Sequence, residues 1–217
     1  MELKQALQEL RKEEKRKFEQ TVDLIINFKG IDLKKNAISV IVNLPHKFKD
    51  KRICGFLENK SDLVKTITKP EFAKYSDKKE LKKLVKDYDF FIANASLMPA
   101  VATTFGKVLG PAGKMPTPQL GVIMGDRPSA VKELVDKIST SLKIRAKEAS
   151  VKLSVGKENM SDEKIIENVT EIYNAVLNAL PQKVENIRNA MIKMTMTKPI
   201  VVEIKWANIK ELFLKQR

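Results

Sequence analysis

Hydrophobic and polar residues alternate along residues 17–29. One parity is apolar and consists of Val22, Leu24, Ile26 and Phe28. The other is polar, interrupted only by Ile25, and consists of Glu19, Thr21, Asp23 and Asn27. A period of two is typical of a strand that is buried on one face. The polar face suits hydrogen bonding to riboses and phosphates, although any solvated sheet face is also polar.

Similar patterns flank this strand at both ends of the chain. A helix is expected over residues 2–16, and a second alternating strand over 38–44, which we expect to pair with the first. The same period returns in three further strands, at residues 151–155, 191–196 and 200–206. Between them, residues 161–180 have the spacing of a long amphipathic helix that ends at Pro181.

From residue 47 to residue 141 the pattern changes, because short apolar strands alternate with helices. The expected strands are residues 52–57, 88–93 and 122–124. The expected helices are residues 61–67, 77–86, 98–108 and 126–139, and Asp77 with Glu80 resembles a capping box. Strands that alternate with helices predict a parallel sheet with helices on its faces.

The fold class predicted from these patterns is an α+β domain interrupted by an inserted Rossmann-like α/β domain. Domain I comprises residues 1–46 plus 142–217, and domain II comprises residues 47–141. Since the chain would cross between the domains twice, we also expect a hinge between them.

Charge and composition narrow the function. The 217 residues include 41 Lys and Arg against 27 Asp and Glu, a net charge of +14 that favours a nucleic-acid partner. Solvated helix faces would increase the numbers of basic and acidic residues together, so they do not explain this excess of basic residues. The sequence has no long apolar run, one cysteine, Cys54, and one histidine, His46. We therefore expect a cytosolic, reduced protein without a membrane span, a disulfide or a metal site.

Residues 109–118 form an unusual segment with two glycines, Gly110 and Gly113, and three prolines. This composition predicts a shaped loop that carries Lys107 and Lys114. It does not match a phosphate-binding Walker A loop, because Val108 and Met115 occupy required glycine and hydroxyl positions. The alternative function, a small α/β nucleotide-using transferase with a basic substrate surface, would need a convergent titratable cluster in domain II. The sequence offers none.

Seven short motifs are distributed along residues 15–204. They are residues 17–23, 44–46, 87–93, 97–99, 109–118, 155–157 and 195–196. In these motifs the chain resembles the ribosomal protein L-one family, the protein of the mobile large-subunit stalk, and in particular its archaeal branch. The run Leu-Gly-Pro-x-Gly-Lys-Met-Pro is the most specific of these matches.

The resemblance implies particular binding residues. Domain I of the family holds folded rRNA, and the corresponding residues here are Lys17, Phe18, Thr21, Asp23, Lys157, Thr195 and Met196. Thr197 belongs to the same set but stands where the family usually has glycine. The domain II loop would contribute Lys107, Gly110, Gly113 and Lys114.

The resemblance also implies a function without catalytic residues or a cofactor. The expected protein is a cytoplasmic constituent of the large ribosomal subunit that binds large-subunit rRNA near the tRNA exit site. It would assist release of deacylated tRNA and repress translation of its own mRNA. When free of RNA it would be a monomer.

Overall fold

The computed structural model describes residues 1–13, 16–32, 38–61, 63–125, 127–146 and 148–203. The chain forms two compact units, each described separately below. Unit 1 comprises Met1–Lys49 with Thr140–Arg217, and unit 2 comprises Asp50–Ser139. The sequence-based division at residues 46/47 and 141/142 differs from these limits by two or three residues. The class is mixed α/β, with helices and several sheets.

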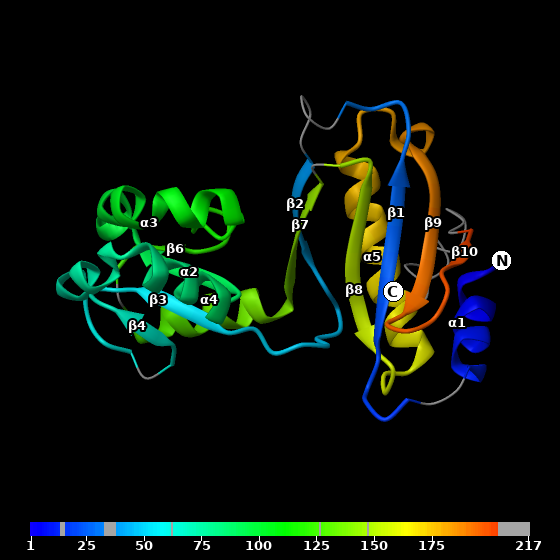
Figure 1. Cartoon of the computed structure of the whole chain (residues 1–217), viewed down its shortest axis with the longest axis horizontal. Coiled ribbons are helices and arrows are strands. Elements are labelled where there is room, and N and C mark those ends of the chain that lie inside the picture. The colour runs from blue at the N-terminus through cyan, green and yellow to red at the C-terminus, as the bar shows by residue number, and fades with distance from the viewer. Residues whose placement is uncertain (14–15, 33–37, 62, 126, 147, 204–217) are drawn as a thin grey trace. The chain divides into compact units, whose positions relative to one another are not determined.

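Unit 1 is built on a four-stranded antiparallel sheet in the order β10-β9-β1-β8 (Figure 1). Its strands are β1 (Thr21–Phe28), β8 (Ser150–Lys157), β9 (Ile187–Met194) and β10 (Ile200–Val202). A separate two-stranded ribbon joins β2 (Ile38–Asn43) to β7 (Ser141–Ala146). The helices are α1 (Leu3–Lys12), α5 (Asp162–Ala179) and the short η3 (Lys183–Asn186).

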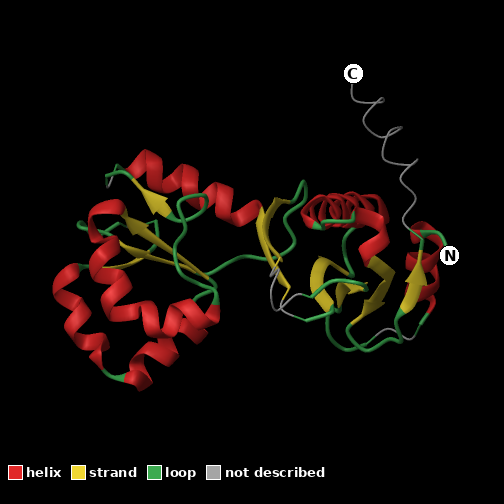
Figure 2. Ribbon diagram, turned by 90° about the horizontal axis from the view of Figure 1, so that it is seen from above, coloured by secondary structure: helices red, strands yellow, loops and turns green. Residues whose placement is uncertain are grey.

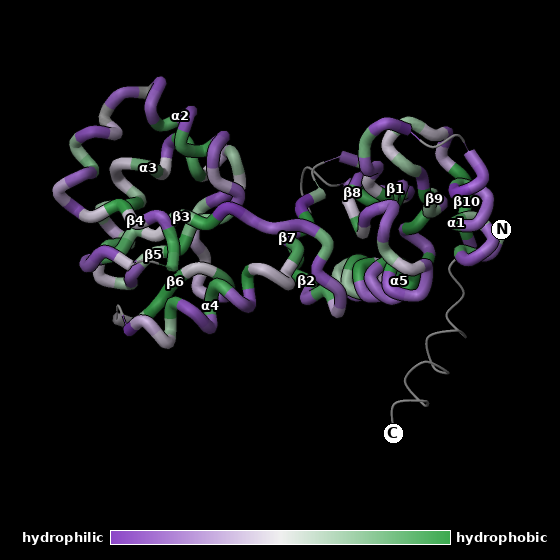
Figure 3. Tube along the Cα trace, turned by 90° about the horizontal axis from the view of Figure 1, so that it is seen from below, coloured by the Kyte–Doolittle hydropathy of each residue, from purple (hydrophilic) through white to green (hydrophobic). Residues whose placement is uncertain are grey.

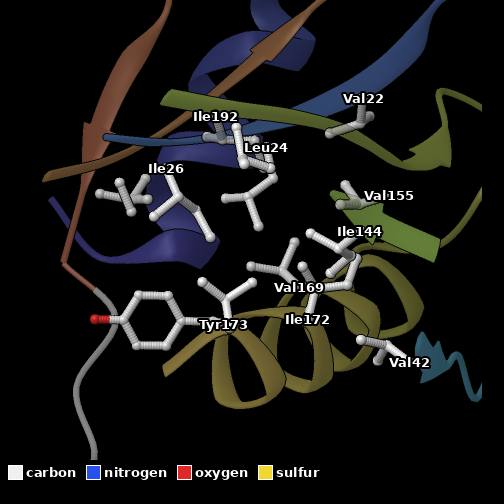
Figure 4. Close-up of a cluster of buried hydrophobic side chains, with 14 of the residues drawn as sticks. Val22, Leu24, Ile26, Val42, Ile144, Val155, Val169, Ile172, Tyr173 and Ile192 are labelled. Carbon is white, nitrogen blue, oxygen red and sulfur yellow. The ribbon is translucent and has the colours of Figure 1, made fainter. Parts of the chain in front are cut away.

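The core of unit 1 lies between the sheet and α5. The predicted apolar face of β1 is confirmed, since every second residue from Val22 to Phe28 is buried. Figure 4 shows Leu24, Ile26 and Ile192 pointing toward Val169 and Ile172 of α5. The helix lies along one face of the sheet, as the view in Figure 2 shows. Among the described elements, no helix covers the opposite face of the sheet (Figure 1).

The predicted pairing of the first two strands is wrong. β1 pairs with β8 and β9, whereas β2 pairs with β7, a strand that the sequence reading missed. Alternation identifies which face of a strand is buried, but it carries no information about a partner more than 100 residues away. β9 also ends earlier than predicted, so Thr195 and Met196 follow the strand and do not belong to it.

Unit 2 contains a parallel sheet in the order β4-β3-β5-β6. Its strands are β3 (Ile53–Phe56), β4 (Lys65–Ile67), β5 (Phe90–Asn94) and β6 (Val122–Ile123). Its helices are η1 (Lys69–Ser76), α2 (Lys78–Asp87), η2 (Ala95–Leu97), α3 (Met98–Ala112) and α4 (Pro128–Thr140). Figure 3 shows hydrophobic strands surrounded by helices with hydrophilic outer turns. The core includes Phe56, Phe72, Phe91 and Phe105.

Two predictions within unit 2 need correction. The helix expected over residues 61–67 is wrong, because Lys65–Ile67 is a strand that pairs in parallel with β3. The capping box occurs at Thr68 and Glu71, whereas Asp77 caps α2 alone by accepting a hydrogen bond from the Lys79 amide. The N-cap predicted at Asp126 lies outside the described residues.

The loop expected from Leu109 also begins later than predicted. α3 continues through Pro111 to Ala112 and ends at Gly113, whose φ of 71° is a conformation that favours glycine. Pro111 has no amide hydrogen to donate one turn back, and α3 ends one residue after it, at Ala112.

Candidate nucleic-acid interface

The antiparallel sheet brings three distant segments of unit 1 to one corner. The start of β1 lies beside the end of β8 and the end of β9, so Thr21 is opposite Lys157 and Val22 is opposite Met194. We call Phe18, Gln20, Thr21, Lys157, Thr195 and Met196 the sheet corner. It contains five of the eight domain I residues that the resemblance assigned to RNA.

Thr21 and Thr195 are joined directly at the sheet corner. Their hydroxyl oxygens are 3.0 Å apart, and the Thr195 hydroxyl also accepts a hydrogen bond of 3.1 Å from the Thr21 amide. Each hydroxyl has one proton and two lone pairs, so the pair keeps capacity for a further partner. The two side chains are therefore held in a fixed relation on the rigid edge of the sheet.

Two large apolar side chains flank this hydroxyl pair and are unusually exposed. Phe18 is 52% exposed and Met196 is 61% exposed. The buried Gln20 links the segment of Phe18 to that of Met196, because its side-chain oxygen accepts a hydrogen bond from the Met196 backbone amide. The backbone amide of Gln20 donates to the Glu158 carboxylate. Sequence reasoning missed Gln20, since a single polar residue before a strand gives no signal of such a role.

A basic cleft of about 500 Å³ lies beside Phe18. Its lining includes Arg11, Arg16, Lys17 and Glu158. Arg11 fixes one wall, because its guanidinium donates to the Asp162 carboxylate at 2.7 Å and to the carbonyls of Glu158 and Met160. The three cations outnumber the two carboxylates of the lining, Glu19 and Glu158, so the cleft beside the exposed aromatic ring is a suitable place for a phosphate and an unstacked base.

The open face of the sheet continues from the sheet corner as polar rows. Asp23 accepts a hydrogen bond of 2.9 Å from Ser154 and lies opposite Lys193 on β9. Asn27 donates to Asn189 at 2.8 Å across the same two strands. At the corner, the Lys157 ammonium contacts the Glu19 carboxylate at 2.8 Å. The face therefore displays donors and acceptors that are already oriented by neighbouring side chains.

Thr197 differs from the other predicted site residues because its side chain is turned inward. It is 9% exposed, and its hydroxyl accepts a hydrogen bond of 2.9 Å from the Met194 amide. This bond closes the turn that follows β9 and so sets the position of Thr195 and Met196. In this geometry Thr197 shapes the sheet corner instead of presenting its own hydroxyl.

The predicted residues of the unit 2 loop do not form one binding cluster. The Lys114 ammonium donates to the carbonyls of Val85 and Tyr88, at 2.7 Å in each case, and thereby caps the end of α2. Gly113 terminates α3, whereas Lys107 and Gly110 lie on exposed parts of that helix. The loop thus has a structural role that its glycines, its prolines and Lys114 explain.

Three of the titratable groups with raised pKa values belong to the core of unit 2, and a fourth, Tyr173, belongs to the core of unit 1. Burial raises the pKa of the Cys54 thiol to about 12 and also raises the pKa of Tyr75 and Tyr88. All three groups are thereby held protonated, which is the opposite of nucleophile activation. Within the described residues, no group of three His, Cys, Asp or Glu side chains is placed to hold a metal ion. None of the described helices is long and apolar enough to cross a membrane.

Cys54 provides a direct test of this burial. At pH 8 we expect the native thiol to react with a thiol reagent at least a hundredfold more slowly than an exposed cysteine, because the raised pKa and the packing both suppress the thiolate. The control is a Cys54→Ala, Ala102→Cys variant, whose thiol lies on the exposed side of α3. If the thiol reagent reacted at equal rates with the folded parent and the folded variant, the buried position of Cys54 would be contradicted.

Comparisons with known proteins identify relatives that match nearly the whole chain. The model of the Ribosomal protein L1p/L10e family matches residues 10–198. A relative named large ribosomal subunit protein uL1 from Cenarchaeum symbiosum is 32% identical over 206 residues, which cover 90% of this chain and 93% of the relative. Proteins of the same name from Archaeoglobus fulgidus and Pyrococcus horikoshii are 34% and 33% identical over 84% and 87% of this chain. The alignments cover 87% and 89% of those two relatives.

Proposed function

The chain belongs to the Ribosomal protein L1p/L10e family, and from this premise we propose that the sheet corner of unit 1 binds folded large-subunit rRNA. The protein is a non-enzymatic constituent of the large ribosomal subunit and is located with the ribosome in the cytoplasm. The alternative of a nucleotide-using transferase is wrong, because the family is one of structural ribosomal proteins.

One observation supports this site above the others, namely the hydroxyl pair of Thr21 and Thr195 between exposed Phe18 and Met196. Hydroxyl groups on a preorganised edge offer hydrogen bonds to riboses and phosphates without a cost in reorganisation. The exposed apolar side chains of Phe18 and Met196 would be removed from water on contact with RNA, which favours binding. RNA that binds here would also reach Lys17 in the adjacent basic cleft.

Thr195→Val tests the proposed site. The substitution keeps the shape of the side chain but leaves an RNA polar group without its partner, at a cost of about 1–3 kcal/mol. We therefore expect binding to large-subunit rRNA to weaken about tenfold or more, as measured by filter binding or fluorescence anisotropy. Since no charge is removed, the dependence of affinity on salt concentration should stay the same.

The matched control is Thr103→Val in unit 2. The Thr103 hydroxyl is exposed and donates a hydrogen bond of 2.9 Å to the carbonyl of Pro99, so this control also exchanges a threonine for valine with the loss of a hydrogen bond. Thr195→Val loses more contacts within the protein, namely those to the amide and hydroxyl of Thr21. We expect Thr103→Val to bind rRNA as the parent does. If Thr195→Val binds like its control while its thermal unfolding is unchanged, the Thr195 hydroxyl does not contact RNA.

The proposal extends to the exit-site tRNA and to the protein's own mRNA. Movement of unit 2 relative to unit 1 would let the rRNA-bound protein accompany deacylated tRNA. A messenger segment that resembles the rRNA element would compete for the same sheet corner and lower translation. The mRNA role is supported by two results together. The messenger should compete with rRNA for the parent protein, and Thr195→Val should weaken the binding of both RNAs.

A further inference from the structure

Positive charge is concentrated on one helix of unit 2. α2 contains five lysines against two carboxylates in ten residues, a net charge of +3 that no other described helix reaches. The longest helix, α5, has a net charge of −3 by the same count. The excess charge of the whole chain is therefore not distributed evenly over its helices.

Four of these lysines form a continuous stripe along α2. They are Lys79, Lys82, Lys83 and Lys86, and all four are exposed. With 3.6 residues per turn they fall within about 100° of the circumference and extend for about 10 Å along the axis. The opposite side of the helix is anchored by Leu81 and Leu84, which are buried in the core of unit 2.

The stripe is not neutralised by neighbouring acidic groups. Among the described residues, no carboxylate lies within 4 Å of any of the four ammonium groups. Like charges three and four positions apart repel one another, so the arrangement is unfavourable for an isolated helix. A polyanionic partner would reverse the sign of this interaction.

Contacts at both ends of α2 hold the stripe rigid. Asp77 accepts a hydrogen bond of 3.2 Å from the Lys79 amide at the start of the helix. At its end, Lys114 donates to the carbonyls of Val85 and Tyr88, and Arg52 donates to the carbonyl of Lys86 at 3.3 Å. These two cations complement the negative end of the helix dipole and add positive charge beside Lys86.

We propose that Lys79, Lys82, Lys83 and Lys86 form a second RNA-binding surface, which binds the phosphate backbone of an RNA duplex without reading its bases. Lysine ammonium groups act as point charges toward phosphates. The fixed stripe offers a row of charges that matches a polyanion. This surface is separate from the sheet corner and goes beyond the rRNA site proposed for unit 1.

The test uses the full chain and a short RNA duplex of arbitrary sequence. In the first variant the four stripe lysines are replaced by glutamine, which preserves helix propensity. The control variant replaces four other exposed lysines of unit 2, namely Lys60, Lys69, Lys74 and Lys132, and so loses the same charge. Affinity is measured by fluorescence anisotropy over a series of salt concentrations.

We expect the stripe variant to bind the duplex at least tenfold more weakly in low salt. The slope of log affinity against log salt should decrease in magnitude by about 2–4 units, because each lost phosphate contact contributes about 0.9. The control variant should change the affinity by less than threefold. Thermal unfolding of the stripe variant should occur at the parental temperature or higher, because repulsion within α2 is removed.

Two results would overturn the proposal. Equal losses in the stripe and control variants would show that charge alone, and not its arrangement on α2, determines binding. Poly-glutamate that binds the parent as tightly as the duplex and loses the same affinity in the stripe variant would identify an acidic polypeptide as the partner. Neither result would affect the proposed rRNA site, because that site is tested by Thr195→Val on large-subunit rRNA.

Discussion

Phe56→Ala is expected to destabilise unit 2 by about 3–5 kcal/mol, the usual cost of removing a large aromatic side chain from a core. Phe56 is fully buried, and its ring lies 4.7 Å from the ring of Phe105 and 5.7 Å from that of Phe91. These rings belong to β3, β5 and α3, so the cavity would loosen the sheet and a helix together. No described residue of unit 1 belongs to this core cluster.

Hydrogen exchange measures this effect in each unit separately. In Phe56→Ala the amides of β3 and β5 should lose protection, whereas those of β1 and β9 should keep it. The control is Phe18→Ala, because the Phe18 side chain is exposed, and its effect on stability should stay within about 0.5 kcal/mol. If protection decreases equally in both units of Phe56→Ala, the units do not unfold independently.

The second large effect is expected for Asn168→Leu. Asn168 is completely buried in α5, where its side-chain oxygen accepts from the His46 amide at 3.1 Å. Its side-chain nitrogen donates to the carbonyls of His46 and Val155 at 3.0 and 2.9 Å. Leucine of similar size would leave three backbone groups without a partner, at about 1–3 kcal/mol for each buried group. We expect urea unfolding to show a total loss of about 3–5 kcal/mol.

A matched substitution on the same helix separates this effect from a change in helix propensity. Asn178 is exposed near the end of α5, and Asn178→Leu should alter stability by no more than about 0.5 kcal/mol. Asn168→Asp adds a second test, because an ionised carboxylate would face two carbonyl oxygens. Its folded-state pKa should be raised, so stability should be highest in acid and decrease as the pH rises above about 4. A variant that is equally stable at pH 3 and pH 7 would contradict this network.

The sequence was most informative where a pattern reflects one local cause. The buried parity of β1 followed from alternation because only a strand places every second side chain on one face. The helix α2 was predicted from Asp77 with Glu80, and the structure confirms Asp77 as its N-cap. The helix predicted over residues 61–67 was wrong because the strand Lys65–Ile67 spans too few residues for its period to be distinguished from that of a helix.

The candidate site was predicted as a set of residues and not as a geometry. The motifs identified Phe18, Thr21 and Thr195, but the hydrogen bonds between Thr21 and Thr195 join residues 174 positions apart. No local pattern encodes that contact. The inward position of Thr197 was also hidden, because a threonine in a turn is compatible with either orientation.

The interrupted arrangement of unit 1 determines the order in which the two units can fold during synthesis. Unit 2 is one continuous segment, whereas β1 must wait for β8 and β9, whose residues follow much later in the chain. At about 5–20 residues per second, the ribosome needs about 10–30 s to travel from Thr21 to Met194. During that time the apolar face of β1 has no sheet to join, and the inserted unit can fold first. The sheet corner is consequently completed only after Met196 has been added, 175 positions after Thr21, so a nascent chain lacks the proposed RNA-binding surface until then.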